Sequence, residues 1–74
     1  NPVTTLSFTL PWLSDVELSI YSLDGQLIKF LVNTQIPAGY HQFVWDATNE
    51  SSGMYLIQLS ANNYTVTEKV LLIK

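Results

Sequence analysis

Apolar and polar residues alternate along most of the chain, and glycine, proline, asparagine or aspartate interrupts the alternation about every ten residues. Residues 6–10 and 16–21 each place an apolar side chain at every second position. Such a period of two is typical of half-buried strands, and no segment keeps the spacing of an amphipathic helix. The pattern therefore indicates an all-β protein.

The same pattern gives the expected strands. They span residues 4–10, 16–21, 40–45, 53–60 and 64–73, with a further strand running through residues 28–32. Six or seven short strands in a chain of 74 residues cannot all lie flat with one face in water. We therefore expect an immunoglobulin-like β-sandwich, with six to seven antiparallel strands in two sheets and a core between them.

The turn at Leu23-Asp24-Gly25 allows two registers for the strands that flank it. A two-residue Asp-Gly turn would place Ile20 opposite Lys29 and Leu18 opposite Leu31. A three-residue loop with a left-handed Gly25 would instead pair Ile20 with Ile28, Leu18 with Phe30 and Val16 with Val32. We prefer the second register, because directly opposed residues share a face and it gives one continuous apolar surface. It leaves Leu27 and Leu31 on the other face, which we then expect to be partly covered.

A two-residue Asn62-Asn63 turn joins the last two expected strands. It sets Leu59 opposite Val66 and Tyr55 opposite Val70, and it also sets Ile57 opposite Glu68. The final apolar run then ends the chain as a strand, flanked by Lys69 and Lys74. These lysines either protect an exposed strand edge or are read by a receptor.

Composition removes several classes of function. The net charge is −3 with only three basic residues, Lys29, Lys69 and Lys74, so there is no basic surface for nucleic acid. The longest apolar run, residues 70–73, is too short to span a bilayer, and we expect no membrane insertion. There is no cysteine, and therefore no disulfide, thiolate nucleophile or thiolate metal site. The chain does not open with methionine, and we expect it to be a single domain, residues 1–74, excised from a longer secreted protein.

Candidate catalytic and ligand-binding residues are few. His41 is the only histidine, which excludes a metal site with several histidine ligands. On an expected strand with Phe43 and Trp45 facing inward, it is interpreted as structural. Asp46, Asn49 and Glu50 offer oxygen ligands, but they fit ordinary turn residues better than a calcium loop. No pair of carboxylates suggests glycoside cleavage. We therefore expect neither an enzyme nor a cofactor.

Four aromatic residues allow two readings. They could form a platform for a sugar ring, or they could belong to the core, which we favour in so small a sandwich. A carbohydrate binder would need them exposed in one plane. The four are Trp12, Tyr21, Tyr40 and Tyr64.

A set of short motifs, none specific alone, resembles one family when taken in order along the whole chain. The chain resembles the type A C-terminal sorting domain of the type IX secretion system in Bacteroidota, and it is also similar to the immunoglobulin-like domain of the flagellar hook-capping protein. The motifs are Asn1-Pro2, residues 6–11, residues 16–21, Asp24-Gly25, residues 37–41, Trp45-Asp46, residues 52–55 and residues 68–74.

The resemblance implies a non-catalytic signal at the C-terminus of a secreted cargo protein. The cargo would reach the periplasm, and the outer-membrane translocon would recognise the folded sandwich. A sortase-like peptidase would commonly remove the domain, leaving the cargo secreted or attached to the cell surface. By position, the implied recognition residues are Pro37, Gly39, Gly53, Tyr55, Lys69, Val70, Leu71, Leu72, Ile73 and Lys74. Glu68 stands where the family commonly has a basic residue.

Two other functions remain open on the sequence. The first is an accessory immunoglobulin-like module of an extracellular enzyme, acting as a spacer, a stabiliser or a weak carbohydrate binder. The second is a flagellar cap domain, which would be inserted within a longer protein. A final strand presented for strand addition to a receptor favours the sorting domain.

Overall fold

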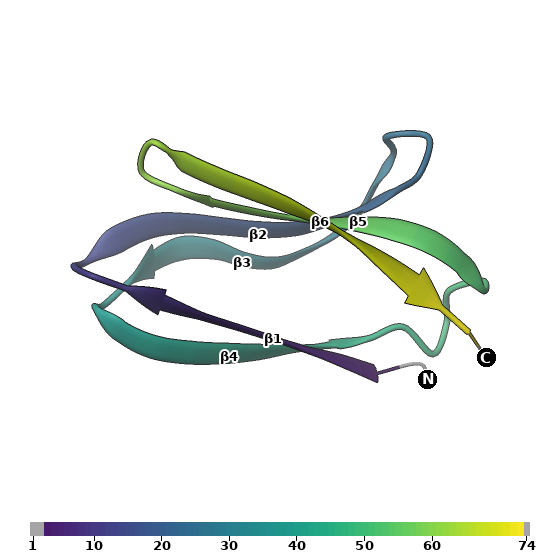
Figure 1. Ribbon diagram of the computed structural model, residues 1–74, viewed down its shortest axis with the longest axis horizontal. Helices are drawn as coiled ribbons and strands as arrows, with labels where there is room; N and C mark the ends of the chain where they lie inside the picture. The colour runs from purple at the N-terminus through teal and green to yellow at the C-terminus, as the bar shows by residue number, and fades with distance from the viewer. Residues whose placement is uncertain (1–2, 74) are drawn as a thin grey trace.

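The structure is a computed structural model that describes residues 3–73, which form a β-sandwich without a helix (Figure 1). Two sheets form the layers: β1 pairs with β4, and the second sheet has the order β3-β2-β5-β6, with all pairs antiparallel. The predicted all-β, immunoglobulin-like sandwich is confirmed. The strands are β1 (Val3–Leu10), β2 (Ser14–Ser22), β3 (Leu27–Ile36), β4 (Gly39–Asp46), β5 (Gly53–Ala61) and β6 (Tyr64–Leu72).

The core lies between the sheets and is built from the inward residues of the alternating pattern. On β2 every second side chain, at Val16, Leu18 and Ile20, is buried. On β4 the predicted inward set is confirmed, since Trp45 is buried and His41 and Phe43 are half-buried. The buried apolar residues are Leu10, Val16, Leu18, Ile20, Val32, Trp45, Ala47, Tyr55, Ile57, Ala61 and Leu72.

The β5–β6 hairpin has the predicted register. Leu59 lies opposite Val66, Tyr55 opposite Val70 and Ile57 opposite Glu68. Asn62 has a φ of 57°, which asparagine tolerates better than most residues do. The two-residue turn therefore sets the register of the whole hairpin.

The loop between β2 and β3 is also the one predicted. The backbone N–H of Gly25 donates to the carbonyl of Ser22 at 3.0 Å, and the N–H of Ser22 donates to the carbonyl of Gln26 at 2.9 Å. Gly25 has a φ of 92°, a conformation that favours glycine. The connection is thus a three-residue loop closed by a left-handed glycine.

The β2–β3 register beyond this loop was predicted wrongly. Ile20 lies opposite Lys29 instead of Ile28, Leu18 opposite Val32 instead of Phe30, and Val16 opposite Thr34 instead of Val32. The register shifts twice, between Leu18 and Ser19 and between Ile20 and Tyr21. Each shift is a bulge that places one extra β3 residue in the ladder.

The extra residues are Ile28 and Leu31, and both pack against the core. Because of the bulges, Ile28, Leu31 and Val32 all reach the core, whereas strict alternation would turn Leu31 outward. Phe30 and Leu27 are exposed. The predicted inward position of Phe30 and the predicted outward position of Leu31 are therefore both wrong.

Candidate functional site

The residues singled out for recognition fall into two groups at opposite ends of the sandwich (Figure 1). Gly39 begins β4, opposite Leu10 at the end of β1, and Pro37 precedes it in the connection from β3. Gly53 begins β5 and lies opposite Leu72 at the end of β6. Tyr55 and residues 69–73 belong to this second group, and Lys74 lies outside the described residues.

The Pro37–Gly39 group is a sharp connection between the two sheets. Gly39 has a φ of 121°, a conformation that residues other than glycine rarely adopt. The Nε2 of His41 is 2.7 Å from the carbonyl oxygen of Pro37, to which it donates a hydrogen bond. The His41 ring lies 5.8 Å from the ring of Phe8. The predicted partial burial of His41 is confirmed, and this hydrogen bond is in keeping with the interpretation of His41 as structural.

Tyr55 is a core residue of the second group. Its ring meets Trp45 edge to face, with 5.3 Å between centroids and an angle of 70° between planes. Its hydroxyl donates to the carbonyl of Ser51 at 2.7 Å. Tyr55 therefore joins the two sheets and holds the loop before β5, and it offers almost no surface to a partner.

The end of β6 has an inward and an outward face. Leu72 is buried and Val70 packs against the core, while Leu71 and Ile73 are 59% and 61% exposed. Met54 lies opposite Leu71 and is also exposed, and directly opposed residues share a face. We call Met54, Leu71 and Ile73 the β6 patch. Exposed apolar residues on an outer strand suit a protein contact better than solvent.

Three of the four aromatic residues interpreted as core are on the surface. Trp12, Tyr40 and Tyr64 are 63%, 64% and 61% exposed, and Tyr21 is half-buried. The core interpretation was wrong because Trp12 lies in the turn between β1 and β2, Tyr64 begins β6 directly after a turn, and Tyr40 faces outward on β4. Exposure meets one requirement of a sugar platform. Of the four rings, however, only Trp12 and Tyr64 line the same groove.

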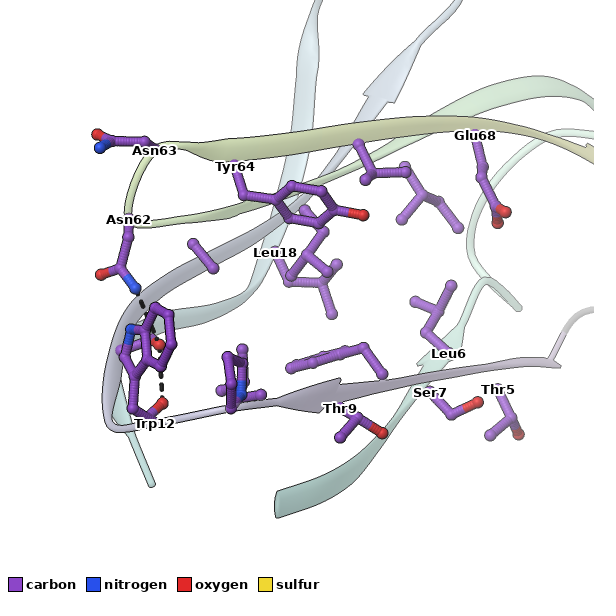
Figure 2. A pocket seen from close by; sticks show the side chains of 18 residues that line it. Thr5, Leu6, Ser7, Thr9, Trp12, Leu18, Asn62, Asn63, Tyr64 and Glu68 are labelled. Atoms are coloured by element: carbon purple, nitrogen blue, oxygen red, sulfur yellow. Dashed lines mark hydrogen bonds between the residues drawn. The ribbon is translucent and has the colours of Figure 1, made fainter. Parts of the chain in front are cut away.

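A groove that sequence reasoning missed opens between the edge of β1 and the edge of β6 (Figure 2). Its volume is about 870 Å³. At one end Trp12 and Asn62 lie close together, where Asn62 Nδ2 donates to Ser14 Oγ at 3.1 Å and Ser14 Oγ donates to the Trp12 carbonyl at 2.9 Å. Its lining comes from residues 5–12, Ser14, Leu18, Ile57, Leu59, residues 61–64, Val66 and Glu68.

The acidic loop after β4 is a turn. The Oδ1 of Asp46 accepts hydrogen bonds from the backbone N–H of Thr48, at 3.0 Å, and from the Thr48 hydroxyl. The N–H of Glu50 donates to the carbonyl of Ala47 at 2.9 Å. These bonds support the interpretation of this loop as ordinary turn residues. Within residues 3–73, no three potential ligands gather at a point that could hold a metal ion.

The comparisons with known proteins give one match. The model of a family described as "Secretion system C-terminal sorting domain" matches residues 1–74. Neither the curated proteins nor the solved structures give a significant match to the chain. In the part of the chain that the structure describes, no helix is long and apolar enough to cross a membrane.

Proposed function

Since the chain belongs to the family of C-terminal sorting domains of the type IX secretion system, we propose that the translocon reads its folded sandwich at the β6 patch. The family sets the function: the chain is the sorting signal for type IX secretion of an attached N-terminal cargo. The protein that carries it is secreted or exposed at the cell surface. Domains of this family are signals and not catalysts.

The proposal adds the route and the machinery. The cargo crosses the periplasm, the outer-membrane translocon binds the sorting domain, and a sortase-like peptidase then removes it. In this proposal residues 1–74 form a single domain at the C-terminal side of the cargo, and the domain itself has no catalytic activity. The organism is expected to belong to the Bacteroidota.

The observation that carries the proposal is the exposure of Leu71 and Ile73 on the last strand. Large apolar side chains that are exposed on an outer strand favour contact with another chain over contact with water. Lys69 is exposed on the same strand and adds a charged neighbour. A receptor strand could pair with the backbone of β6 while its side chains cover the patch.

The other expected recognition residues act through the fold in this proposal. Tyr55 and Leu72 are buried, and Val70 packs against the core. Pro37 and Gly39 shape a connection at the far end of the sandwich from the β6 patch. Replacing any of them would alter the sandwich that presents β6. The direct contacts in this proposal are made by Lys69, Leu71, Ile73 and Lys74.

An export assay tests the β6 patch. A fluorescent cargo with a periplasmic signal peptide carries the 74 residues at its C-terminus, in Bacteroidota cells with and without an intact translocon. We expect the wild-type domain to bring fluorescence to the surface or the medium only when the translocon is intact. Leu71→Asp should leave the cargo in the periplasm, because a carboxylate in the patch opposes burial against a receptor.

Leu23→Asp is the matched control, since Leu23 is as exposed as Ile73 but lies at the tip of the β2–β3 loop. It should be exported like the wild type. Leu71→Thr, which keeps a good strand former, separates loss of the patch from loss of the strand. Export of folded Leu71→Asp at the wild-type level would refute recognition at the β6 patch.

A further inference from the structure

The groove between β1 and β6 separates two strand edges that lack a partner strand among residues 3–73. Among the strands of residues 3–73, β1 pairs with β4 alone and β6 with β5 alone. An unpaired edge presents a row of backbone donors and acceptors. Figure 2 shows the two strands on either side of the groove, with Tyr64 and Leu6 facing it from opposite walls.

The residues that line the walls and floor of the groove belong to the core or pack against it, and several of them are only partly covered. Leu18 and Ile57 lie at its floor and are buried. Leu6, Phe8 and Leu59 line it and are only half-buried, although they pack against the core. The reason is the unequal size of the sheets, since two strands face four. One more strand beside β1 would complete the cover.

Among the outer strands of residues 3–73, β1 is the one that carries no charged residue. Natural edges are blunted by charges, prolines or bulges. The other outer strands each carry a charge, at Lys29 on β3, Asp46 on β4 and Glu68 on β6. β1 has no charged residue and no proline, and its eight residues pair with β4 without a register shift. The edge of β1 is therefore suited to pairing with a further strand.

We propose that the groove holds a seventh strand, supplied by the segment of the cargo polypeptide that leads directly into this chain. The inference rests on the sorting function, because a sorting tail continues from its cargo in one polypeptide. β1 begins at Val3, so a segment just before it can fold back along the groove as the other arm of a hairpin. That strand runs antiparallel to β1 and parallel to β6.

The tethered segment is favoured over a second copy of the chain. A hairpin closes a short loop at small entropic cost, whereas a second copy loses translational and rotational freedom on binding. The chemistry of the segment follows from the groove. The side chains that face Leu59 and Val66 are apolar, the one nearest Glu68 is polar or basic, and the alternate side chains, which face away from the groove, are polar.

Thiol labelling tests the inference directly, because the chain has no cysteine of its own. Val66→Cys places a thiol in the groove, and Thr67→Cys places one on the next residue of β6, which is exposed and outside the groove. Each is prepared in the 74-residue chain and in a chain extended by the residues that precede it in the precursor. The probe is N-ethylmaleimide.

We expect the extension to slow labelling of Val66→Cys by about tenfold or more, because the thiol is then reached only when the added strand opens. Labelling of Thr67→Cys should stay the same. Leu59→Cys provides a second groove position if Val66→Cys disturbs folding. Equal rates for the groove thiol with and without the extension would overturn the proposal. So would protection in the 74-residue chain that rises with protein concentration, which would identify a second copy as the occupant.

The labelling result is independent of export. A protected groove together with normal export of Leu71→Asp would leave the seventh strand standing and remove the β6 patch as the recognition surface. An open groove together with retention of Leu71→Asp would do the opposite.

Discussion

The two sheets of the sandwich contribute unequally to its core. The four-stranded sheet supplies most of the buried apolar residues, including Leu18, Ile20 and Ile57. The two-stranded sheet supplies Leu10 and Trp45. A two-stranded sheet is marginal by itself, so β1 and β4 depend on what they pack against.

How deeply the inward residues of a strand are buried depends on how many strands lie beside it. Leu18 on β2 and Leu6 on β1 are both leucines that line the groove. β2 has a partner strand on each side, and Leu18 is 2% exposed. β1 has one partner and borders the groove, and Leu6 is only half-buried.

The largest loss of stability is expected on replacing the residue through which the two-stranded sheet packs on the four-stranded one. Trp45 is 1% exposed and packs edge to face on Tyr55 of β5. Trp45→Ala should lower the free energy of unfolding by about 3–5 kcal/mol, as large-to-small substitutions of aromatic core residues do. Small domains have about 5–15 kcal/mol in total, so the variant should be largely unfolded at modest urea concentration. Urea denaturation followed by circular dichroism measures the loss.

Trp12→Ala is the control, because Trp12 is on the surface. It should change the free energy of unfolding by about 0.5 kcal/mol or less. If both tryptophan variants lose the same stability, the small sheet is not held through Trp45.

The next effect compares the two leucines. Leu18→Ala should cost about 2–5 kcal/mol, because it leaves a cavity in close-packed surroundings. Leu6→Ala should cost about 1 kcal/mol, because the half-buried side chain loses less apolar contact and its space is open to water. Urea denaturation of both variants gives the difference. Equal losses would mean that β1 is as well covered as β2, and a larger loss for Leu6→Ala in the extended chain would point to the added strand.

The strands themselves could be predicted well from the sequence. Alternation and turn residues place β1, β4, β5 and β6 within one or two residues of their observed bounds, since the period of two is a local property. The register of β5 and β6 also followed from Asn62-Asn63, because no bulge interrupts that pair. The register of β2 and β3 failed because two bulges admit Ile28 and Leu31 to the core. Whether a bulge forms depends on packing across the sandwich, and the local alternation of apolar and polar residues gives no information about that packing.

The site was predictable only as far as it is local. The last strand with its exposed Leu71 could be anticipated from the apolar run at the end of the chain. The surface positions of Trp12 and Tyr64 were missed, although Trp12 lies in the turn between β1 and β2 and Tyr64 directly follows the Asn62-Asn63 turn. The groove was also missed. It exists because β1 and β6 end up as outer strands of different sheets, and that follows from the topology.

The smallest effect is expected at the tip of the β2–β3 hairpin, outside both layers of the core. The Ser22 hydroxyl and then the Gln26 backbone N–H donate hydrogen bonds to the Asp24 carboxylate, and they lower its pKa below the usual value. A carboxyl whose pKa is lower folded than unfolded contributes stability above about pH 4 and loses it as the pH falls through the folded pKa. Asp24→Asn should therefore have a lower thermal midpoint than the wild type at pH 7, and this difference should be smaller at about pH 2 than at pH 7.

Differential scanning calorimetry at both pH values measures this change, with the exposed Asp15→Asn on β2 as the control. Ser22→Ala removes the larger cause of the shift and should reproduce most of the effect of Asp24→Asn at neutral pH. The Asp24 side chain is exposed and fully screened by water, so the change should be far smaller than that of Leu18→Ala in the same sheet. A difference that persists unchanged at low pH would trace the effect to the geometry of the turn and not to the charge of Asp24. The stability of the large sheet would still reside in its buried face, where Leu18 and Ile20 meet the other layer.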